Sequence, residues 1–333
     1  MNRRDWLGGS ISAGLLAAGA PGWLGAATAP PPNVPVIGLL DAVARRMAPE
    51  VNNGLEENGL VYGKDFKFER SGWSGRPSEY QADQLAKYAA KLVERKVALI
   101  LAFSNKAAVA AKTVTGTTPV IFLADDPMAA GLVDCLMKPG GNLTGIANLD
   151  SKLTAKRIKI ARELVPAAEL VVLVTDPTNQ PAHGIEIREA QAAAKALHLE
   201  LSIVAWTGEH SIEIELSALP RDRKAVLVFG GGLPFLVQDS TLAYLAVRYG
   251  FPAIHGFRQA VEEGGLVSFG NRLADGWRQM GGCAARILRG DKPADLPVAK
   301  LTRTELVINV WPAKSLGLCI PPTLLARADE VIE

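Results

Sequence analysis

The sequence has few of the residues that build metal sites, disulfide frameworks or nucleophilic active sites. Its 333 residues include only 3 cysteines and 4 histidines. An odd number of cysteines in apolar surroundings predicts buried thiols rather than a disulfide framework. No G-x-S-x-G, H-E-x-x-H, P-loop or C-x-x-C motif occurs in it. We therefore expect no catalytic residues, no bound metal and no cofactor.

An excess of charge of either sign is also missing. The chain has 36 Lys and Arg residues against 34 Asp and Glu residues. A nucleic-acid partner would need a sizeable basic patch, so this balance argues against one. No long apolar run occurs after the first thirty residues. We therefore expect the mature chain to be soluble.

The N-terminus has the three regions of a signal peptide, which we place at residues 1–29. A charged start containing Arg3 and Arg4 precedes a Gly/Ala-rich apolar segment and then small residues up to Ala29. The paired arginines resemble a twin-arginine signal and predict export to the periplasm. An ordinary secretion signal remains the alternative. Cleavage after Ala26, Ala27 or Ala29 fits the small residues there.

The remaining chain alternates short apolar runs with helical patterns. Wholly apolar runs such as 36–40, 97–101, 170–174 and 225–229 predict buried parallel strands, and the patterns between them predict helices. Repeated strand–helix units require right-handed crossovers and a parallel sheet. We predict an α/β protein with two Rossmann-like lobes whose parallel sheets are joined by three hinge crossovers.

We place the boundary between the two predicted lobes in the stretch 119–145. Val120–Leu123 predicts a buried strand, which we interpret as the last strand of the first lobe. The turn cluster 139–142 then leads into the second lobe. Glycines around the short strand 264–270 suit a hinge segment that returns to the first lobe. We expect one lobe over 33–145 plus about 267–293, the other over 146–266 plus about 294–333, and a closing helix over 321–331.

Candidate ligand-binding residues follow the predicted strands, because open α/β sheets bind ligands at the carboxyl ends of their strands. Either of two adjacent carboxylates, Asp125 and Asp126, could face a ligand ammonium group, but both could instead cap the next segment. Ser104 and Asn105 begin a helix whose backbone N–H groups could bind a carboxylate, although a cap alone would explain Ser104. The full set of predicted ligand-binding residues is Asp41, Phe103, Ser104, Asn105, Asp125, Asp126, Asp176, Asn179, Gly231, Gly232 and His255.

Three further stretches carry a family resemblance. The first begins at Asp126-Pro127 and continues through residues 131–133 to 139–145. The second is the segment 264–270, and the third is the tail from 305 to 330, which contains Ile320-Pro321-Pro322. The chain resembles ABC transporter substrate-binding proteins of the tryptophan/tyrosine-binding type. The resemblance spans the chain after the signal peptide. It implies a type I periplasmic-binding-protein fold with a ligand in the cleft between the lobes.

These observations predict a monomeric periplasmic receptor of an ABC importer. It would bind a small organic molecule, such as an amino acid or an aromatic carboxylate, by hinge closure and deliver it to a permease in the inner membrane. One alternative is a secreted α/β enzyme with Asp125 or Asp126 as general base, although a nucleophile and metal ligands are missing. The other is a periplasmic ligand sensor that signals through another protein.

Overall fold

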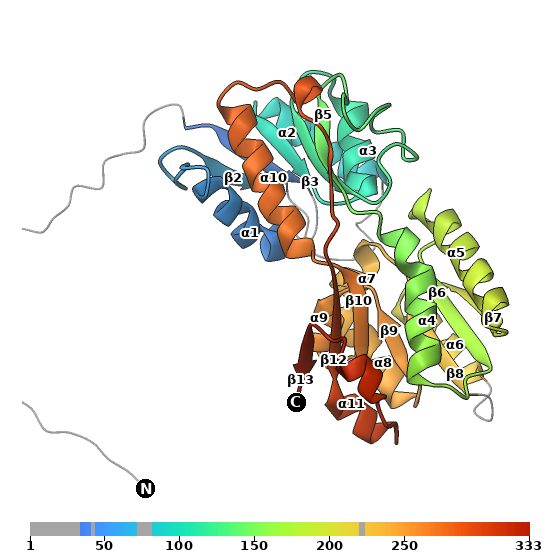
Figure 1. Ribbon diagram of the computed structural model, residues 1–333. Helices are drawn as coiled ribbons and strands as arrows, with labels where there is room; N and C mark the ends of the chain where they lie inside the picture. Colours follow the sequence, from blue (N-terminus) through green and yellow to red (C-terminus); the bar gives the residue numbers. More distant parts are fainter. Residues whose placement is uncertain (1–33, 41–43, 72–81, 220–223) are drawn as a thin grey trace, which may run out of the picture.

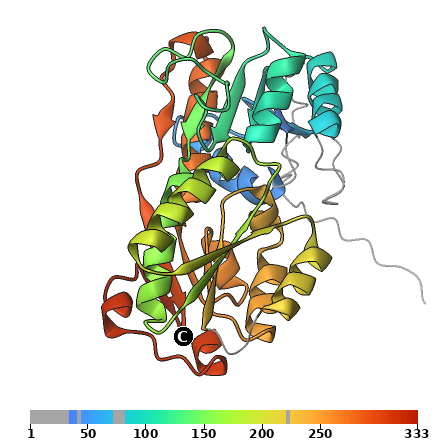
Figure 2. The same cartoon turned by 90° about the vertical axis from the view of Figure 1, so that its right-hand side faces the viewer.

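The protein consists of two α/β lobes, each built on its own sheet (Figure 1). The computed structural model describes residues 34–40, 44–71, 82–219 and 224–333. The predicted signal peptide and Asp41 therefore lie outside the described residues. Figure 2 shows the two lobes one above the other, with the described C-terminus at the base of the second lobe.

Lobe 1 contains a six-stranded sheet in the order β11-β5-β4-β3-β1-β2, in which every pair is parallel. Its strands are β1 (Val36–Leu40), β2 (Lys67–Arg70), β3 (Leu99–Ala102), β4 (Val120–Ala124), β5 (Leu143–Ala147) and β11 (Ala299–Lys300). Its helices are α1 (Ala44–Glu56), α2 (Ala82–Glu94), α3 (Asn105–Val114) and α10 (Leu273–Leu288), with the 3₁₀ turn η3 (Pro293–Asp295). β1, β3 and β4 are almost entirely buried because helices cover both faces, which explains their unbroken apolar sequences.

Lobe 2 contains a seven-stranded sheet in the order β13-β12-β10-β9-β8-β6-β7, in which only the β10–β12 pair is antiparallel. Its strands are β6 (Leu170–Thr175), β7 (Glu200–Ala205), β8 (Ala225–Phe229), β9 (Ala253–His255), β10 (Val267–Asn271), β12 (Thr304–Asn309) and β13 (Glu330–Ile332). Its helices are α4 (Thr154–Leu164), α5 (Ala182–Ala196), α6 (Glu209–Ala218), α7 (Leu233–Val237), α8 (Asp239–Arg248), α9 (Arg258–Glu262), α11 (Val310–Ser315) and α12 (Pro322–Leu325), with the 3₁₀ turn η2 (Asp150–Leu153).

The chain crosses between the lobes three times, as predicted. The crossings follow β5, β10 and β11 and lie side by side: Leu301 donates its backbone N–H to Ala147 (2.9 Å) and Arg272 donates to Arg303 (3.0 Å). After the second crossing, α10 packs on α1 through two glycines. A Cβ on Gly54 would stand 2.0 Å from the Arg278 carbonyl oxygen, so only glycine permits this approach.

The sheet pairings move the expected lobe boundaries by a few residues. The sheet of lobe 1 includes β5, which extends to Ala147 beside β4, so the first crossing comes after this strand. The expected return to lobe 1 at about 267 comes instead after Asn271, because β10 pairs with β9 and β12 in lobe 2. Lobe 1 also keeps β11, which pairs with β5, although we expected residues from about 294 in lobe 2.

Two other predictions are wrong. The closing helix ends at Leu325, and Glu330–Ile332 instead forms a parallel strand against β12. Asp329 holds this turn, because its carboxylate accepts the Leu306 N–H at 2.8 Å. The thiols are not all buried either: Cys135 and Cys319 are exposed and only Cys283 is half-buried, because the first two lie outside helices and strands.

Candidate functional site

A cavity lies between the two lobes, where the carboxyl ends of both sheets face each other. Its free volume is about 70 Å³, room for a few water molecules, so the two lobes lie close together around it. Its lining residues come from both lobes: Met47, Phe103, Ser104, Asn105, Lys106, Leu123, Ala124, Asp125, Asn148, Asp176, Asn179, Ala182, Glu186, Gly231, Gly232, Leu236, Phe257 and Leu273. Eight predicted residues are brought together here, while Asp126 and His255 are not among the lining residues.

The start of α3 contributes polar groups from lobe 1. Ser104 is the N-cap, and its Oγ accepts the Ala107 N–H at 3.1 Å. Asn105 is buried, and its Oδ1 accepts the backbone N–H of Asp125 at 2.8 Å. The Nδ2 of Asn105 has no hydrogen-bond partner among the described residues, so it is a donor that a ligand could use.

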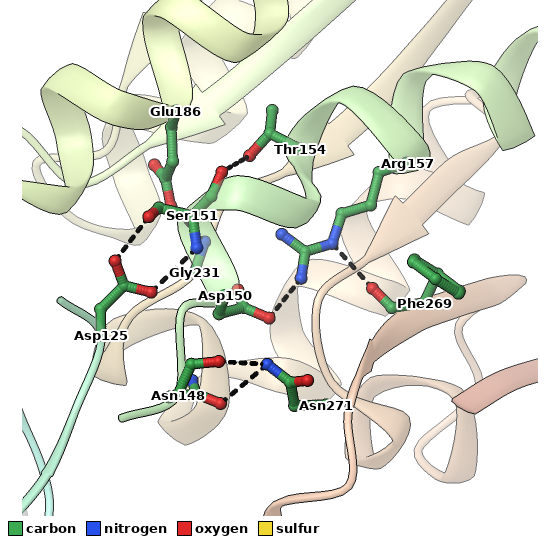
Figure 3. Close-up of polar contacts among 10 residues, drawn as sticks. All are labelled: Asp125, Asn148, Asp150, Ser151, Thr154, Arg157, Glu186, Gly231, Phe269 and Asn271. Atoms are coloured by element: carbon green, nitrogen blue, oxygen red, sulfur yellow. Dashed lines mark hydrogen bonds and ion pairs between the residues drawn. The ribbon is translucent and has the colours of Figure 1, made fainter. Parts of the chain in front are cut away.

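The two adjacent carboxylates point to different places. Asp125 lines the cavity, and its two oxygens accept the N–H and the hydroxyl of Ser151 at 2.9 and 2.5 Å (Figure 3). Because Ser151 belongs to η2, these bonds tie lobe 1 to the first crossing. Burial raises the pKa of Asp125 to about 6. Asp126 instead accepts the Ala129 N–H at 3.2 Å and lies 3.4 Å from Lys152, outside the cavity, so it stabilises its own turn.

An ion pair spans the cavity from one lobe to the other. Lys106 in α3 lies 3.5 Å from the carboxylate of Asp176, which follows β6, and also donates to the Thr178 hydroxyl. Asp176 in turn accepts the N–H and the hydroxyl of Thr178 at 2.9 and 2.5 Å. Asn179 completes this loop by donating its N–H to the Asp176 carbonyl at 3.1 Å. The contact between Lys106 and Asp176 holds the lobes together.

Glu186 is the principal cavity residue that sequence reasoning missed. It lies in the second turn of α5, is 1% exposed, and accepts the Gly231 N–H at 2.6 Å and the Thr175 hydroxyl. Glycine in the facing loop leaves room for this carboxyl group, because a Cβ on Gly230 would stand 2.6 Å from a Glu186 oxygen and the side chain would have to shift. Burial raises the pKa of Glu186 to about 8.

Further polar contacts join α4, β10 and the crossings near Glu186 (Figure 3). Arg157 of α4 is fully buried, pairs with Asp150 at 2.6 Å and donates to the Phe269 carbonyl of β10 at 2.8 Å. Asn271, at the second crossing, donates its side-chain amide to the carbonyl and side-chain oxygens of Asn148 at the first. The first and second crossings are therefore joined by partly buried hydrogen bonds.

Apolar side chains form the rest of the cavity wall. Phe103 is 4% exposed and lies beside the start of α3, and Phe257 faces from lobe 2. His255, which we expected near the cleft, is buried instead: its ring stacks on Phe229 with centroids 4.7 Å apart. Burial, together with Arg157, lowers the pKa of His255 to about 3, so it is neutral at physiological pH.

The described residues provide no built metal site and no membrane span. Within 34–40, 44–71, 82–219 and 224–333, no group of three or more His, Cys, Asp or Glu side chains could hold a metal ion. In the same ranges, every helix is too short or too polar to cross a membrane.

Comparisons with known proteins give one curated relative and several similar structures. A tyrosine-binding protein of Clostridioides difficile is 27% identical over 231 residues, which are 69% of this chain and 66% of that protein. The chain thus matches slightly less than two thirds of the length of this relative.

Three solved structures share the fold, and this chain is covered to 90% in each. A conserved domain protein from Vibrio cholerae is 22% identical, with a TM-score of 0.77 and its whole chain covered. An ABC domain in complex with L-Trp from Streptococcus pneumonia is 23% identical, with a TM-score of 0.74 and full coverage. The ligand-free, open structure of a substrate-binding protein with adhesive properties from Clostridium difficile is 22% identical, with a TM-score of 0.62 and 99% coverage.

The family assignment comes from a model of the whole fold. The family described as ABC transporter substrate binding protein matches residues 38–332, which include both lobes, the three crossings and every described residue of the cavity. The chain belongs to the ABC transporter substrate-binding protein family.

Proposed function

We propose that this protein is the periplasmic solute receptor of an ABC importer. It binds a small organic molecule, such as an amino acid or an aromatic carboxylate, between its lobes and presents it to a permease in the inner membrane. The observation that carries this proposal is the cavity itself: both lobes line it, and the Lys106–Asp176 pair closes across it. A closure of this kind needs a hinge, which the three crossings provide.

The ligand class follows from the cavity lining. The Asn105 amide is a donor without a partner among the described residues and suits a carboxylate, while Phe103 and Phe257 suit an apolar or aromatic body. The tyrosine-binding relative and the L-Trp complex support an aromatic amino acid as the first ligand to test.

Export and assembly complete the proposal. Arg3 and Arg4 of the predicted signal peptide favour the twin-arginine route to the periplasm. The receptor acts as a monomer. It needs no cofactor, because the energy for transport comes from the partner transporter. An enzyme with Asp125 as general base is less favoured, because both carboxylate oxygens already accept hydrogen bonds from Ser151.

Native mass spectrometry tests this function directly. Protein purified without refolding should carry a small organic molecule, or should bind one from a panel of aromatic amino acids, branched amino acids and aromatic acids. Small-angle scattering should then show that the ligand makes the protein more compact. If no panel member binds and no molecule co-purifies, or if a bound molecule is chemically converted, the proposal is refuted.

A further inference from the structure

The acidic groups near the cavity differ in whether a positive charge already faces them. Asp126 lies outside the cavity with Lys152, and Asp176 faces Lys106. Asp125 has no cation beside it among the described residues, and its two oxygens accept hydrogen bonds from Ser151 at the first crossing, just as those of Glu186 accept from Gly231 and Thr175. A ligand ammonium group near Asp176 would also meet the like charge of Lys106.

Glu186 is the acidic group of the cavity wall that approaches a second buried carboxyl group, Asp150, around Gly231, and it has no ion pair among the described residues. The guanidinium of Arg157 pairs with Asp150 at 2.6 Å through Nη2 and donates its Nε to the Phe269 carbonyl, while its buried Nη1 has no hydrogen-bond partner among the described residues. The cluster therefore contains two carboxyl groups and one guanidinium. An isolated buried carboxylate is costly, so a Glu186 carboxylate needs a further cation.

A second observation points to a missing donor at the same place. The Oδ2 of Asp150 is buried and has no hydrogen-bond partner among the described residues. This oxygen and Oε1 of Glu186 both lie within 3.4 Å of the point where a Cβ on Gly231 would stand. The two acidic side chains thus approach each other around a glycine that lines the cavity.

We propose that Glu186 recognises the ammonium group of the ligand, which is therefore an amine-bearing molecule such as an α-amino acid. This inference rests on the proposed function and makes its ligand class more specific. In the empty cavity Glu186 is a neutral carboxylic acid. When the ammonium group binds, the Glu186 O–H bond breaks, the proton passes to the buffer, and the carboxylate and the ammonium form an ion pair. Charge and protons balance, because the bound cation replaces the released proton.

The electrostatics of the cluster agree with this exchange. Burial is the main cause of the raised pKa of about 8, and the negative charge of Asp150 adds to it. A group with that pKa is about nine-tenths protonated at pH 7. The titratable and charged groups around it are Asp150 of η2, Arg157 of α4, and His183 of α5, which contacts the same Thr175 hydroxyl.

The test compares matched ligands on matched variants. L-tryptophan and L-tyrosine are measured by calorimetry against indole-3-propionate and 3-(4-hydroxyphenyl)propionate, which lack the amine. Glu186→Gln keeps an oxygen for the Gly231 N–H but loses the charge. Glu189→Gln makes the same change in the same helix at a residue that does not line the cavity. We expect Glu186→Gln to weaken amino-acid binding at least tenfold and to leave the amine-free acids and the control unchanged.

Proton release gives a second readout that needs no variant. Wild-type titrations of each amino acid at pH 7, in two buffers of different ionisation enthalpy, should show close to one proton released. If amino acids bind without proton release, or if Glu186→Gln binds them as tightly as wild type does, the inference fails while the receptor function stands. If the wild type binds the amine-free acids more tightly than the amino acids, the inference also fails and the receptor function again stands. If none of the four probes binds, the inference fails together with the proposed aromatic ligand class.

Discussion

The buried pair of Arg157 and Asp150 allows a sharp prediction about stability. Arg157 is fully buried, and Arg157→Met removes both its ion pair with Asp150 and its hydrogen bond to the Phe269 carbonyl. Methionine is flexible enough to fill much of the vacated space. What it cannot replace is the positive charge, so Asp150, which is 2% exposed, is left buried and unpaired. Removal of one partner from such a pair costs about 3–5 kcal/mol.

The measurement is urea unfolding followed by far-UV circular dichroism. We expect Arg157→Met to lower the free energy of unfolding by about 3–5 kcal/mol with little change in the slope against urea. Lys159→Met, an exposed position of the same helix, should change it by less than about 0.5 kcal/mol. Adding Asp150→Leu to Arg157→Met should recover part of the loss, because no carboxylate remains buried. A loss below about 1 kcal/mol, or a double variant as unstable as the sum of both single variants, would refute this reasoning.

Three further predictions concern closure, pH and export. Lys106→Met should leave the fold intact but open the ligand-free cleft, since it removes the cation that faces Asp176; an unchanged scattering curve would count against this role. The raised pKa of Asp125 means that its contribution to stability is full below about pH 4 and is lost as the pH rises to about 6, a change of at most about 3 kcal/mol. The stability difference between wild type and Asp125→Asn should therefore shrink over this range in chemical unfolding, and a constant difference would contradict the assignment. Changing Arg3 and Arg4 to Lys should block export of the precursor, and an undiminished periplasmic yield would indicate the ordinary secretion route.

The fold was predictable from the sequence because its central strands are buried on both faces. The run 225–229 coincides with β8, and the amphipathic pattern at 273–288 coincides with α10. β5 was missed because Gly145 and Thr144 interrupt its apolar sequence. At the C-terminus, Leu324, Ala328 and Val331 have the spacing of a helical face, but pairing with β12 determines the structure there.

The site residues that could be predicted are those that follow a parallel strand, because the sheet topology sets their position. Asp125 and Asp176 stand directly after strands and Gly231 lies two residues after one. Because the carboxyl ends of parallel strands converge on one edge, the sequence indicated the cavity lining there. Glu186 gave no such signal, because it lies inside a helix among other charged residues. Arg157 is one of several basic residues in α4, and nothing in the sequence distinguishes this buried arginine from its exposed neighbours. Long-range contacts decide both positions, and a single sequence does not contain them.

The positions of the interlobe contacts determine what hinge motion must break. The Asp125–Ser151 bonds join lobe 1 to the first crossing, and the Asn271–Asn148 bonds join the first two crossings, where rotation displaces atoms least, so both can persist as the lobes open. Lys106 instead reaches from the start of α3 to the loop after β6, across the cavity, and its contact with Asp176 must separate before a ligand leaves. A ligand stabilises the closed form only through groups that it contacts better there than in the open form. With Asn105 on one lobe and Glu186 on the other, a zwitterion has such groups on both sides, because its two charges can bind both lobes at once only when the cleft is closed.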